Sequence, residues 1–424
     1  MSNNLQLMTA RRFCPLFWTQ FCGAMNDNLF KNALVMLITY RIGENSGYGV
    51  STLLSMQTAL FILPYFLFSA LAGQIADKYP KAVLAQWIKL IEIGLAILAA
   101  AGMVMGSLWF MFFVLFLFGT HSAFFGPIKY AILPELLSER ELLAGNGLIE
   151  AGTLIAILFG TIAAGLFTLM PYGAEFVGAS VCMIAYIGYW VSKEIPIGAA
   201  INPDLKIDWN IFADTAKILN RAAKNRDVFA SILTISWFWF IGAAFVTLLP
   251  AMVKYQIHAN QEVITYLFVL FSVGIAIGSV LCSKIMRDRI GTSIVPVAAL
   301  GVSVFSIDLW WVVTHYAAFS DIAGLGEFLR APDAIRITAD LLLLTLSGGV
   351  FIVPLYTILQ SKSESGERAR MLAANNIVNA MFMVASSLAS LQLMHLQFSI
   401  AEIFAIYGII NLIIGAMIAW RWRI

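Results

Sequence analysis

Apolar residues fill most of this 424-residue chain in long runs, each closed by a short stretch of charged or turn-forming residues. A helix needs about 20 apolar residues to cross the hydrocarbon core of a bilayer. The chain contains twelve windows of that length, and we therefore expect an all-α integral membrane protein. The predicted spans are 13–40, 51–75, 82–104, 107–131, 142–169, 173–192, 228–252, 262–284, 292–315, 338–359, 370–394 and 398–420.

Composition supports this prediction and excludes several classes of protein. Hydrophobic residues make up 60% of the chain and charged residues 12%, whereas a soluble domain carries about a quarter charged residues. A soluble enzyme of this composition could not cover its surface with polar side chains. The net charge of +2 leaves no basic face for nucleic acid. No cleavable signal is expected, because the first apolar run is too long and lacks a small-residue cleavage site.

No motif for enzyme or cofactor chemistry is present in the sequence. The four cysteines are scattered, without the paired spacing of a disulfide framework or a zinc site. The histidines are isolated, and neither a phosphate-binding glycine loop nor a nucleophile elbow occurs. We therefore expect no enzyme, no cofactor, no metal and no ATP-driven transport. The histidines are His121, His258, His315 and His395.

The positive charges predict the orientation of the helices. With the N-terminus in the cytoplasm, 20 Lys and Arg residues fall on the inner side and four on the outer side. Cytoplasmic loops of membrane proteins carry this excess, so both termini are expected in the cytoplasm. The longest inner connection, 193–227, divides the chain into two six-helix bundles, 1–192 and 228–424. Its basic run favours an amphipathic helix that lies on the anionic inner leaflet.

The two halves of the chain resemble each other. The segment "LAGNGLIEA" at 143–151 matches "LAANNIVNA" at 372–380, and "PIKYAIL" upstream of the first resembles "PLYTIL" upstream of the second. Gly73 and Gly278 end corresponding helices. Parallel repeats of six helices are typical of the major facilitator architecture, where the substrate binds at mid-membrane between the halves.

The connection between the second and third helices carries a candidate gate, "GQIADKYPK". A glycine, an aspartate four residues later and then basic residues resemble the signature of the major facilitator superfamily. The resemblance implies that Gly73, Asp77 and Lys81 hold the cytoplasmic gate shut. Lys78, Pro80 and Lys81 replace the more usual Arg, Gly and Arg, and the second half has Cys282 where the aspartate would stand. The alternative is an ordinary charged turn.

Charged residues within the apolar spans are the next candidates, because each costs about 3 kcal/mol or more unless it is paired or hydrated. Asp27 and Lys31 lie four residues apart and could neutralise each other, as could Lys89 and Glu92, three apart. Either pair could be purely structural. Two further acidic residues are Glu150 and Asp308, the latter close to the outer end of its helix, where we expect it to reach the interface.

The first half thus offers a polar track from mid-membrane towards the cytoplasm, with cations suited to a phosphate. Its candidate substrate-binding residues are Asp27, Asn28, Lys89, Lys129, Asn146 and Glu150. The second half would face this track with aromatic side chains and amides, although each aromatic residue could equally pack against lipid. These candidates are Trp237, Phe238, Trp239, Phe240, Phe245, Asn375, Asn376 and Asn379.

Longer motifs resemble one branch of the superfamily, the bacterial lysophospholipid transporter family. They are "MNDNLFKN" at 25–32, "FGPIKYAILPELL" at 125–137, "SWFWFIGAAF" at 236–245 and "GGVFIVPLYTILQ" at 348–360. The resemblance is to the membrane portion found fused to acyltransferase and acyl-carrier-protein synthetase modules. It implies a flippase that moves lysophospholipids, such as lysophosphatidylethanolamine, across the bacterial inner membrane to the cytoplasmic leaflet for re-acylation. The family's charged cavity residues fall on Asp27, Lys89, Lys129 and Glu150.

The sequence ends at Ile424, just after the last span, and carries no acylating module, which leaves open whether a separate acyltransferase or synthetase carries out re-acylation. The expected partners are the lysophospholipid and membrane lipids, and the expected state is a monomer. Two other functions are compatible with the same sequence. An exporter of amphipathic drugs would have the same composition, and a membrane scaffold could recruit acyltransferases through 193–227.

Overall fold

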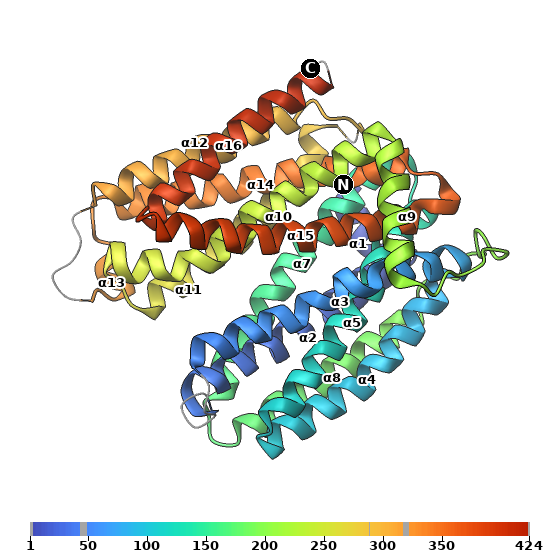
Figure 1. Cartoon of the computed structure of the whole chain (residues 1–424), viewed down its shortest axis with the longest axis horizontal. Coiled ribbons are helices and arrows are strands. Elements are labelled where there is room, and N and C mark those ends of the chain that lie inside the picture. The colour runs from blue at the N-terminus through green and yellow to red at the C-terminus, as the bar shows by residue number, and fades with distance from the viewer. Residues whose placement is uncertain (1–2, 43–48, 288, 317–321, 423–424) are drawn as a thin grey trace. The chain divides into compact units, whose positions relative to one another are not determined.

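The structure is a computed structural model that describes residues 3–42, 49–287, 289–316 and 322–422 (Figure 1). In these ranges the chain is all-helical and forms no strand. The long helices are α2 (Cys14–Leu37), α3 (Val50–Lys78), α4 (Lys81–Met105), α5 (Leu108–Ala131), α7 (Glu139–Thr168), α8 (Gly173–Ser192), α10 (Arg226–Met252), α11 (Gln261–Ile285), α12 (Val295–Thr314), α14 (Ala334–Lys362), α15 (Arg368–His395) and α16 (Ile400–Arg421). The short helices are α1 (Asn3–Thr9), α6 (Leu133–Leu136), α9 (Ile211–Lys224) and α13 (Leu325–Phe328), with η1 (Ile38–Ile42), η3 (Val253–Ile257) and η4 (Ser365–Glu367).

Each of the twelve predicted spans coincides with one long helix, and the ends agree to within about one helical turn. Eleven helices in the described part of the chain are long and apolar enough to cross a membrane. The remaining one, α2, has 24 residues but carries Asn26, Asp27, Asn28 and Lys31 in its centre. The prediction of an all-α membrane protein is therefore confirmed.

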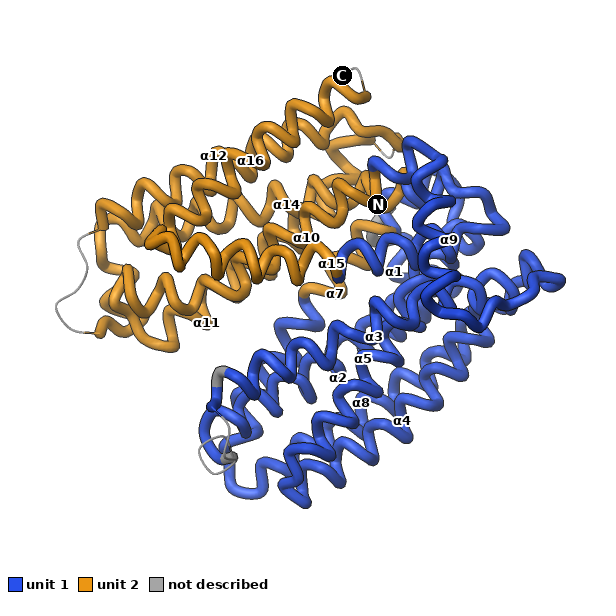
Figure 2. The backbone as a smooth tube through the Cα atoms, in the orientation of Figure 1, with its two compact units in different colours: residues 1–145, 155–230, 359–380 blue, residues 146–154, 231–358, 381–424 orange. Residues whose placement is uncertain are grey.

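The described chain forms two compact units (Figure 2). Unit 1 contains residues 1–145, 155–230 and 359–380, and unit 2 contains 146–154, 231–358 and 381–424. Each unit thus takes one short segment from the other half of the sequence. These two segments, 146–154 and 359–380, overlap the repeated sequences at 143–151 and 372–380. The proposed division into bundles 1–192 and 228–424, joined by 193–227, stays a prediction.

Small residues allow the helices of unit 1 to pack closely. A Cβ placed on Gly119 of α5 would lie 2.5 Å from the carbonyl oxygen of Phe61 on α3, and one on Gly178 of α8 would lie 2.8 Å from the Cβ of Ala100 on α4. Close approach through small residues is the usual way in which helices associate in a membrane. Rings fill the interior, where Phe30 and Phe118 pack in a tilted arrangement with their centroids 5.2 Å apart.

Unit 2 has its own core, which is built around α10, α12, α14 and α16. The rings of Phe245 and Phe404 stack with their centroids 4.0 Å apart. A buried amide links three helices, because Asn411 of α16 donates to the carbonyl oxygen of Ala299 at 2.8 Å and accepts from the indole of Trp237 at 3.0 Å. These two bonds give partners to the amide, the indole and the backbone carbonyl, which would have none in hydrocarbon.

The internal repeat has a structural counterpart in each unit. In unit 1 a Cβ on Gly73 would lie 2.8 Å from the Cβ of Ala373 on α15, and in unit 2 a Cβ on Gly147 of α7 would lie 2.4 Å from the carbonyl oxygen of Ser279 on α11. Pro127 interrupts α5 as Pro354 interrupts α14. A proline inside a helix removes one backbone hydrogen bond and bends the helix.

The connection between the halves contains α9, the amphipathic helix expected there. The side chain of Asn210 caps its start by accepting from the amide of Ala213 at 3.1 Å. Its buried face, with Asp214, Ile218 and Ala222, packs on α3 rather than facing outwards. The predicted helix is confirmed, and its contact with an anionic leaflet stays a prediction.

Candidate functional site

The predicted gate lies at the end of α3, where this helix meets the beginning of α15. Gly73 makes the approach possible, because a Cβ there would lie 2.9 Å from the Cα of Arg370. Any larger residue would push the two helices apart. Asp77 follows one turn later on the same face of α3, and its side chain is fully buried.

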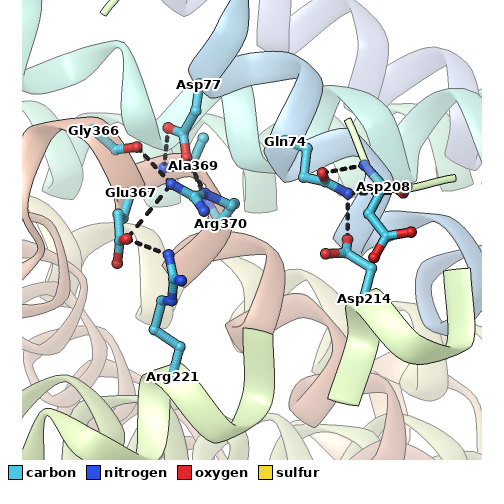
Figure 3. Close-up of polar contacts among 9 residues, drawn as sticks. All are labelled: Gln74, Asp77, Asp208, Asp214, Arg221, Gly366, Glu367, Ala369 and Arg370. Atoms are coloured by element: carbon cyan, nitrogen blue, oxygen red, sulfur yellow. Dashed lines mark hydrogen bonds and ion pairs between the residues drawn. The ribbon is translucent and has the colours of Figure 1, made fainter. Parts of the chain in front are cut away.

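The Asp77 carboxylate binds the first turn of α15 (Figure 3). It accepts from the backbone amide of Ala369 at 3.0 Å and from Nε of Arg370, also at 3.0 Å. The backbone amides of a first helical turn have no partner within the helix and attract negative charge. The helix end and the guanidinium therefore stabilise the carboxylate together. Arg370 also donates to the carbonyl oxygen of Gly366 at 2.9 Å. These contacts join residues almost 300 positions apart.

Lys81, the third predicted gate residue, does not contact Asp77 directly. Its ammonium, almost completely buried, lies 2.6 Å from Oε1 of Glu135 at the end of α6. The three gate candidates thus divide into Gly73 and Asp77 at the interface with α15, and Lys81 at a neighbouring ion pair that joins α4 to α6.

Gln74 holds the linker against α3 with both ends of its amide group (Figure 3). Its oxygen accepts from the amide of Asp208 at 2.8 Å, and its nitrogen donates to the Asp214 carboxylate at 2.5 Å. Burial raises the pKa of Asp214, although the bond from Gln74 opposes the change. The hydrogen bond from Lys217 lowers the pKa of Asp208 and raises that of the lysine.

A buried polar cluster lies inside unit 1, between α2, α4 and α5. Lys89 and Glu92, predicted to pair, form an ion pair of 2.6 Å and are both fully buried. Asn26 donates to the same carboxylate at 2.8 Å, and Nε2 of His121 lies 3.3 Å from it. The Lys89 ammonium also lies 4.9 Å from the centre of the Phe125 ring. The carboxylate therefore compensates the lysine charge without any contribution from outside the unit.

Asp27 and Lys31, which the sequence places on one helix face, form no direct ion pair within the described ranges. Asp27 instead accepts a hydrogen bond from Ser122 of α5, and its second oxygen has no hydrogen-bond partner among the described residues. The Lys31 ammonium lies 5.3 Å from the centre of the Phe61 ring on α3. The four-residue spacing places both side chains on one face, but partners on neighbouring helices are better oriented.

The other unit 1 candidates lie at different helix positions. Asn28 donates to the carbonyl oxygen of Ala24 on its own helix at 2.8 Å. The Lys129 ammonium lies 4.8 Å from the centre of the Tyr130 ring. On α15, Asn375 is 1% exposed and neither of its amide atoms has a hydrogen-bond partner within the described ranges, while Asn379 is 9% exposed. These candidates thus come from three helices of unit 1, namely α2, α5 and α15.

The remaining candidates belong to unit 2. Asn146 is fully buried and donates to the Thr357 hydroxyl on α14 at 3.2 Å, and Glu150, one turn later, is 1% exposed. Trp237 packs in the core, stacked on Phe240. Trp239 donates to the Tyr356 hydroxyl at 3.4 Å. Near these rings, side chains of α10, α11 and α14 line a small apolar cavity. Its lining includes Phe238, Phe245, Phe271 and Phe351.

Asp308, which the sequence led us to expect at the interface, is paired with an arginine of the next long helix. The Arg336 guanidinium donates to both carboxylate oxygens, from Nε to Oδ2 at 2.9 Å and from Nη2 to Oδ1. The same guanidinium lies 4.5 Å from the centre of the Trp311 ring. The pair joins α12 to α14. It could not be predicted from local spacing, because 28 residues separate the partners.

Several residues of this site were missed by sequence reasoning. Arg370 and Glu367 were visible only as charges near the inner membrane surface, Gln74 only as part of the gate motif, and His121 only as an isolated histidine. Their partners are distant in the sequence, so no local spacing could have identified them. Within the described ranges, no group of three His, Cys, Asp or Glu side chains could hold a metal ion.

Two curated relatives carry the same description. The lysophospholipid transporter LplT of Escherichia coli strain SE11 is 27% identical over 364 residues, which are 84% of this chain and 82% of that protein. The LplT of Shigella boydii serotype 18 gives the same identity and coverage.

Solved structures agree on the fold. The human organic anion transporter MFSD10 matches with a TM-score of 0.76 and 12% identity, over 96% of this chain and 99% of that one. The proton:xylose symporter XylE matches with a TM-score of 0.69 and 12% identity, over 99% and 96%. The sequence model of the Major Facilitator Superfamily matches residues 16–379. The chain is therefore a multi-pass membrane protein of the Major Facilitator Superfamily, a family of transporters and not of enzymes.

Proposed function

We propose that this protein is a flippase that moves lysophospholipids across a bacterial inner membrane to the cytoplasmic leaflet, where they are re-acylated. The similarity to proteins named lysophospholipid transporters over 84% of the chain carries this proposal. The two sequence halves, 1–192 and 228–424, are the bodies that would move in an alternating-access cycle. Both termini would lie in the cytoplasm, and the protein would act as a monomer with a separate acyltransferase or synthetase.

The chemistry of a lysophospholipid fits the polar groups of unit 1. Its head group carries a phosphate and often an ammonium, and both need compensation inside a membrane. We assign the ammonium to Asp27, which retains one oxygen without a partner among the described residues, and the phosphate to Lys129. Lys89 belongs to the same proposed site, but a phosphate there would have to compete with Glu92.

The other proposed substrate contacts come from amides and rings. Asn28 and Asn146 would contact the head group beside Asp27 and Glu150, and Asn375 and Asn379 would supply amides from α15. Trp237 and Trp239 would contribute apolar surface for the single acyl chain. Gly73, Asp77 and Lys81 would form the cytoplasmic gate. Breaking the contacts of Asp77 with α15 would be required whenever this end of the protein opens.

Uptake of a fluorescent lysophospholipid, measured in bacterial cells that lack other lysolipid flippases, tests this function. The protein should restore lysophospholipid uptake. In a drug-export assay, cells that contain the protein should export drug no faster than cells that lack it. Export of an amphipathic dye without lysolipid uptake would favour a drug exporter. A scaffold would move neither compound.

A further inference from the structure

The linker between the two halves of the sequence is bound to both sides of the proposed gate. On one side, it is attached to α3. The amide of Asn202 donates to the backbone oxygen of Asp77 at 3.1 Å, and Gln74 is held at both ends of its side chain by Asp208 and Asp214. The linker therefore contacts α3 at two residues, the gate residue Asp77 and Gln74.

On the other side, the linker is attached to the connection between α14 and α15. Arg221, near the end of α9, forms an ion pair with Glu367, and Nη2 of Arg370 lies 3.7 Å from the same Glu367 oxygen (Figure 3). Asn225 donates to the backbone oxygen of Lys362 at 3.2 Å. A continuous chain of charges thus runs from Arg221 through Glu367 and Arg370 to Asp77.

The two attachments differ strongly in burial. Gln74 and Asp214 are 3% and 5% exposed, and α9 places apolar side chains against α3 beside them. The side chains of Arg221 and Glu367 are 50% and 28% exposed. Water and salt weaken an exposed ion pair, whereas a hydrogen bond to a buried charge is costly to lose. The attachment to the connection between α14 and α15, through Glu367 and Lys362, is therefore the one that can be released.

We propose that α9 is a latch of the gate, which stays docked on α3 through Gln74 and releases α15 at the Arg221–Glu367 pair when the gate opens. Arg221 and Gln74 are in this sense positioning residues, because they act on Asp77 and Arg370 and touch no substrate. While the latch is closed, Glu367 holds Arg370 near Asp77. Once it opens, the linker no longer restrains the first turn of α15.

The proposal rests on the alternating-access part of the proposed function and not on the identity of the substrate. Spin labels on cysteines at three exposed positions test it in the purified full-length chain, with the native cysteines replaced. The positions are Tyr79 at the end of α3, Phe212 on α9 and Glu364 before α15. Distances are measured by pulsed electron paramagnetic resonance for each pair of labels, with Asp77→Asn as the variant that opens the gate.

In Asp77→Asn, the 79–364 and 212–364 distances should lengthen together, while the 79–212 distance stays single and short. Arg221→Ala should raise the long-distance fraction by up to about fivefold, as removal of one exposed ion pair would, and more at low salt than at high salt. Arg221→Lys keeps a positive charge opposite Glu367 and leaves Glu367 beside Arg370, so the long-distance fraction should stay close to its original value. Lys224→Ala removes a neighbouring charge of α9 that makes no ion pair among the described residues and should have no effect.

Gln74→Met keeps the length of the side chain and removes its hydrogen bonds. It should broaden the 79–212 distance, because α9 loses its attachment to α3. Lengthening of 79–212 with an unchanged 212–364 distance in Asp77→Asn would overturn the proposal, since the linker would then travel with α15. Unchanged distributions in all variants would overturn it as well. Failure of lysolipid uptake would not affect these distances, so the two proposals fail separately.

Discussion

Replacement of Asp77 by asparagine is the most informative change at the gate. Asparagine has almost the same shape and can still accept one hydrogen bond from the amide of Ala369. It cannot compensate the Arg370 guanidinium, which now lies 3.0 Å from the carboxylate. Loss of one charge-assisted hydrogen bond costs about 2 kcal/mol, and Arg370 keeps its bond to Gly366. At 1.4 kcal/mol per factor of ten, the open form should become roughly thirtyfold more populated.

Ser69 provides the position for the assay. It lies on the face of α3 that carries Gly73 and Asp77, and its side chain is fully buried. Ser69→Cys is a small change, and in a chain without the native cysteines it gives one thiol that a maleimide can reach only when α3 and α15 separate. The alkylation rate should increase roughly thirtyfold when Asp77→Asn is added, in line with the same 1.4 kcal/mol per factor of ten.

Asp204→Asn is the matched control, since it removes an exposed aspartate of the linker and should leave the rate unchanged. Equal alkylation rates in the Asp77 and Asp204 variants, with both proteins folded, would refute the reasoning. Asp77 would then belong to a charged turn with no role in gating.

Three further changes follow from the same structure. Lys129→Ala should abolish lysolipid transport in a well-expressed protein, and Lys129→Arg should restore part of it because the charge is kept; normal transport by the alanine variant would remove Lys129 from the site. Asp27→Asn should impair uptake more than Glu150→Gln does, with sodium and the proton gradient varied independently, and the reverse order would move the site to α7. Because burial raises the folded-state pKa of Asp214, docking of α9 should weaken as pH rises through the window between its ordinary and its raised value. Asp214→Asn keeps an acceptor for Gln74 and should remove this dependence, as measured by hydrogen exchange of α9.

The helices were predictable because their apolar length is a local property of the sequence. All twelve spans lie where the hydrophobic pattern places them, and Lys89 and Glu92 pair as their spacing of three suggests. The same kind of argument did not predict the direct partner of Asp27. Its spacing of four from Lys31 was equally favourable, but Ser122 on another helix competes for the carboxylate.

The partners of the gate were not predictable for the same physical reason. Asp77 was identified from a short motif, yet Arg370 and Ala369 lie almost 300 residues away and share no pattern with it. The amphipathic character of α9 predicted a helix with one apolar face. It could not distinguish a lipid surface from α3 as the partner of that face, because both are apolar. The structure shows the packing of α9 on α3, with the bond between Gln74 and Asp214 beside it.

Transport by the purified protein in liposomes tests the central claim most directly. A fluorescent lysophosphatidylethanolamine is placed in the outer leaflet, and the fraction that albumin can no longer extract is followed over time. The account predicts that the protein speeds this movement well beyond the rate in empty liposomes, that Lys129→Ala returns it to that rate, and that the two-chain phosphatidylethanolamine is not moved. A rate equal to that of empty liposomes, or equal movement of the two-chain lipid, would contradict it.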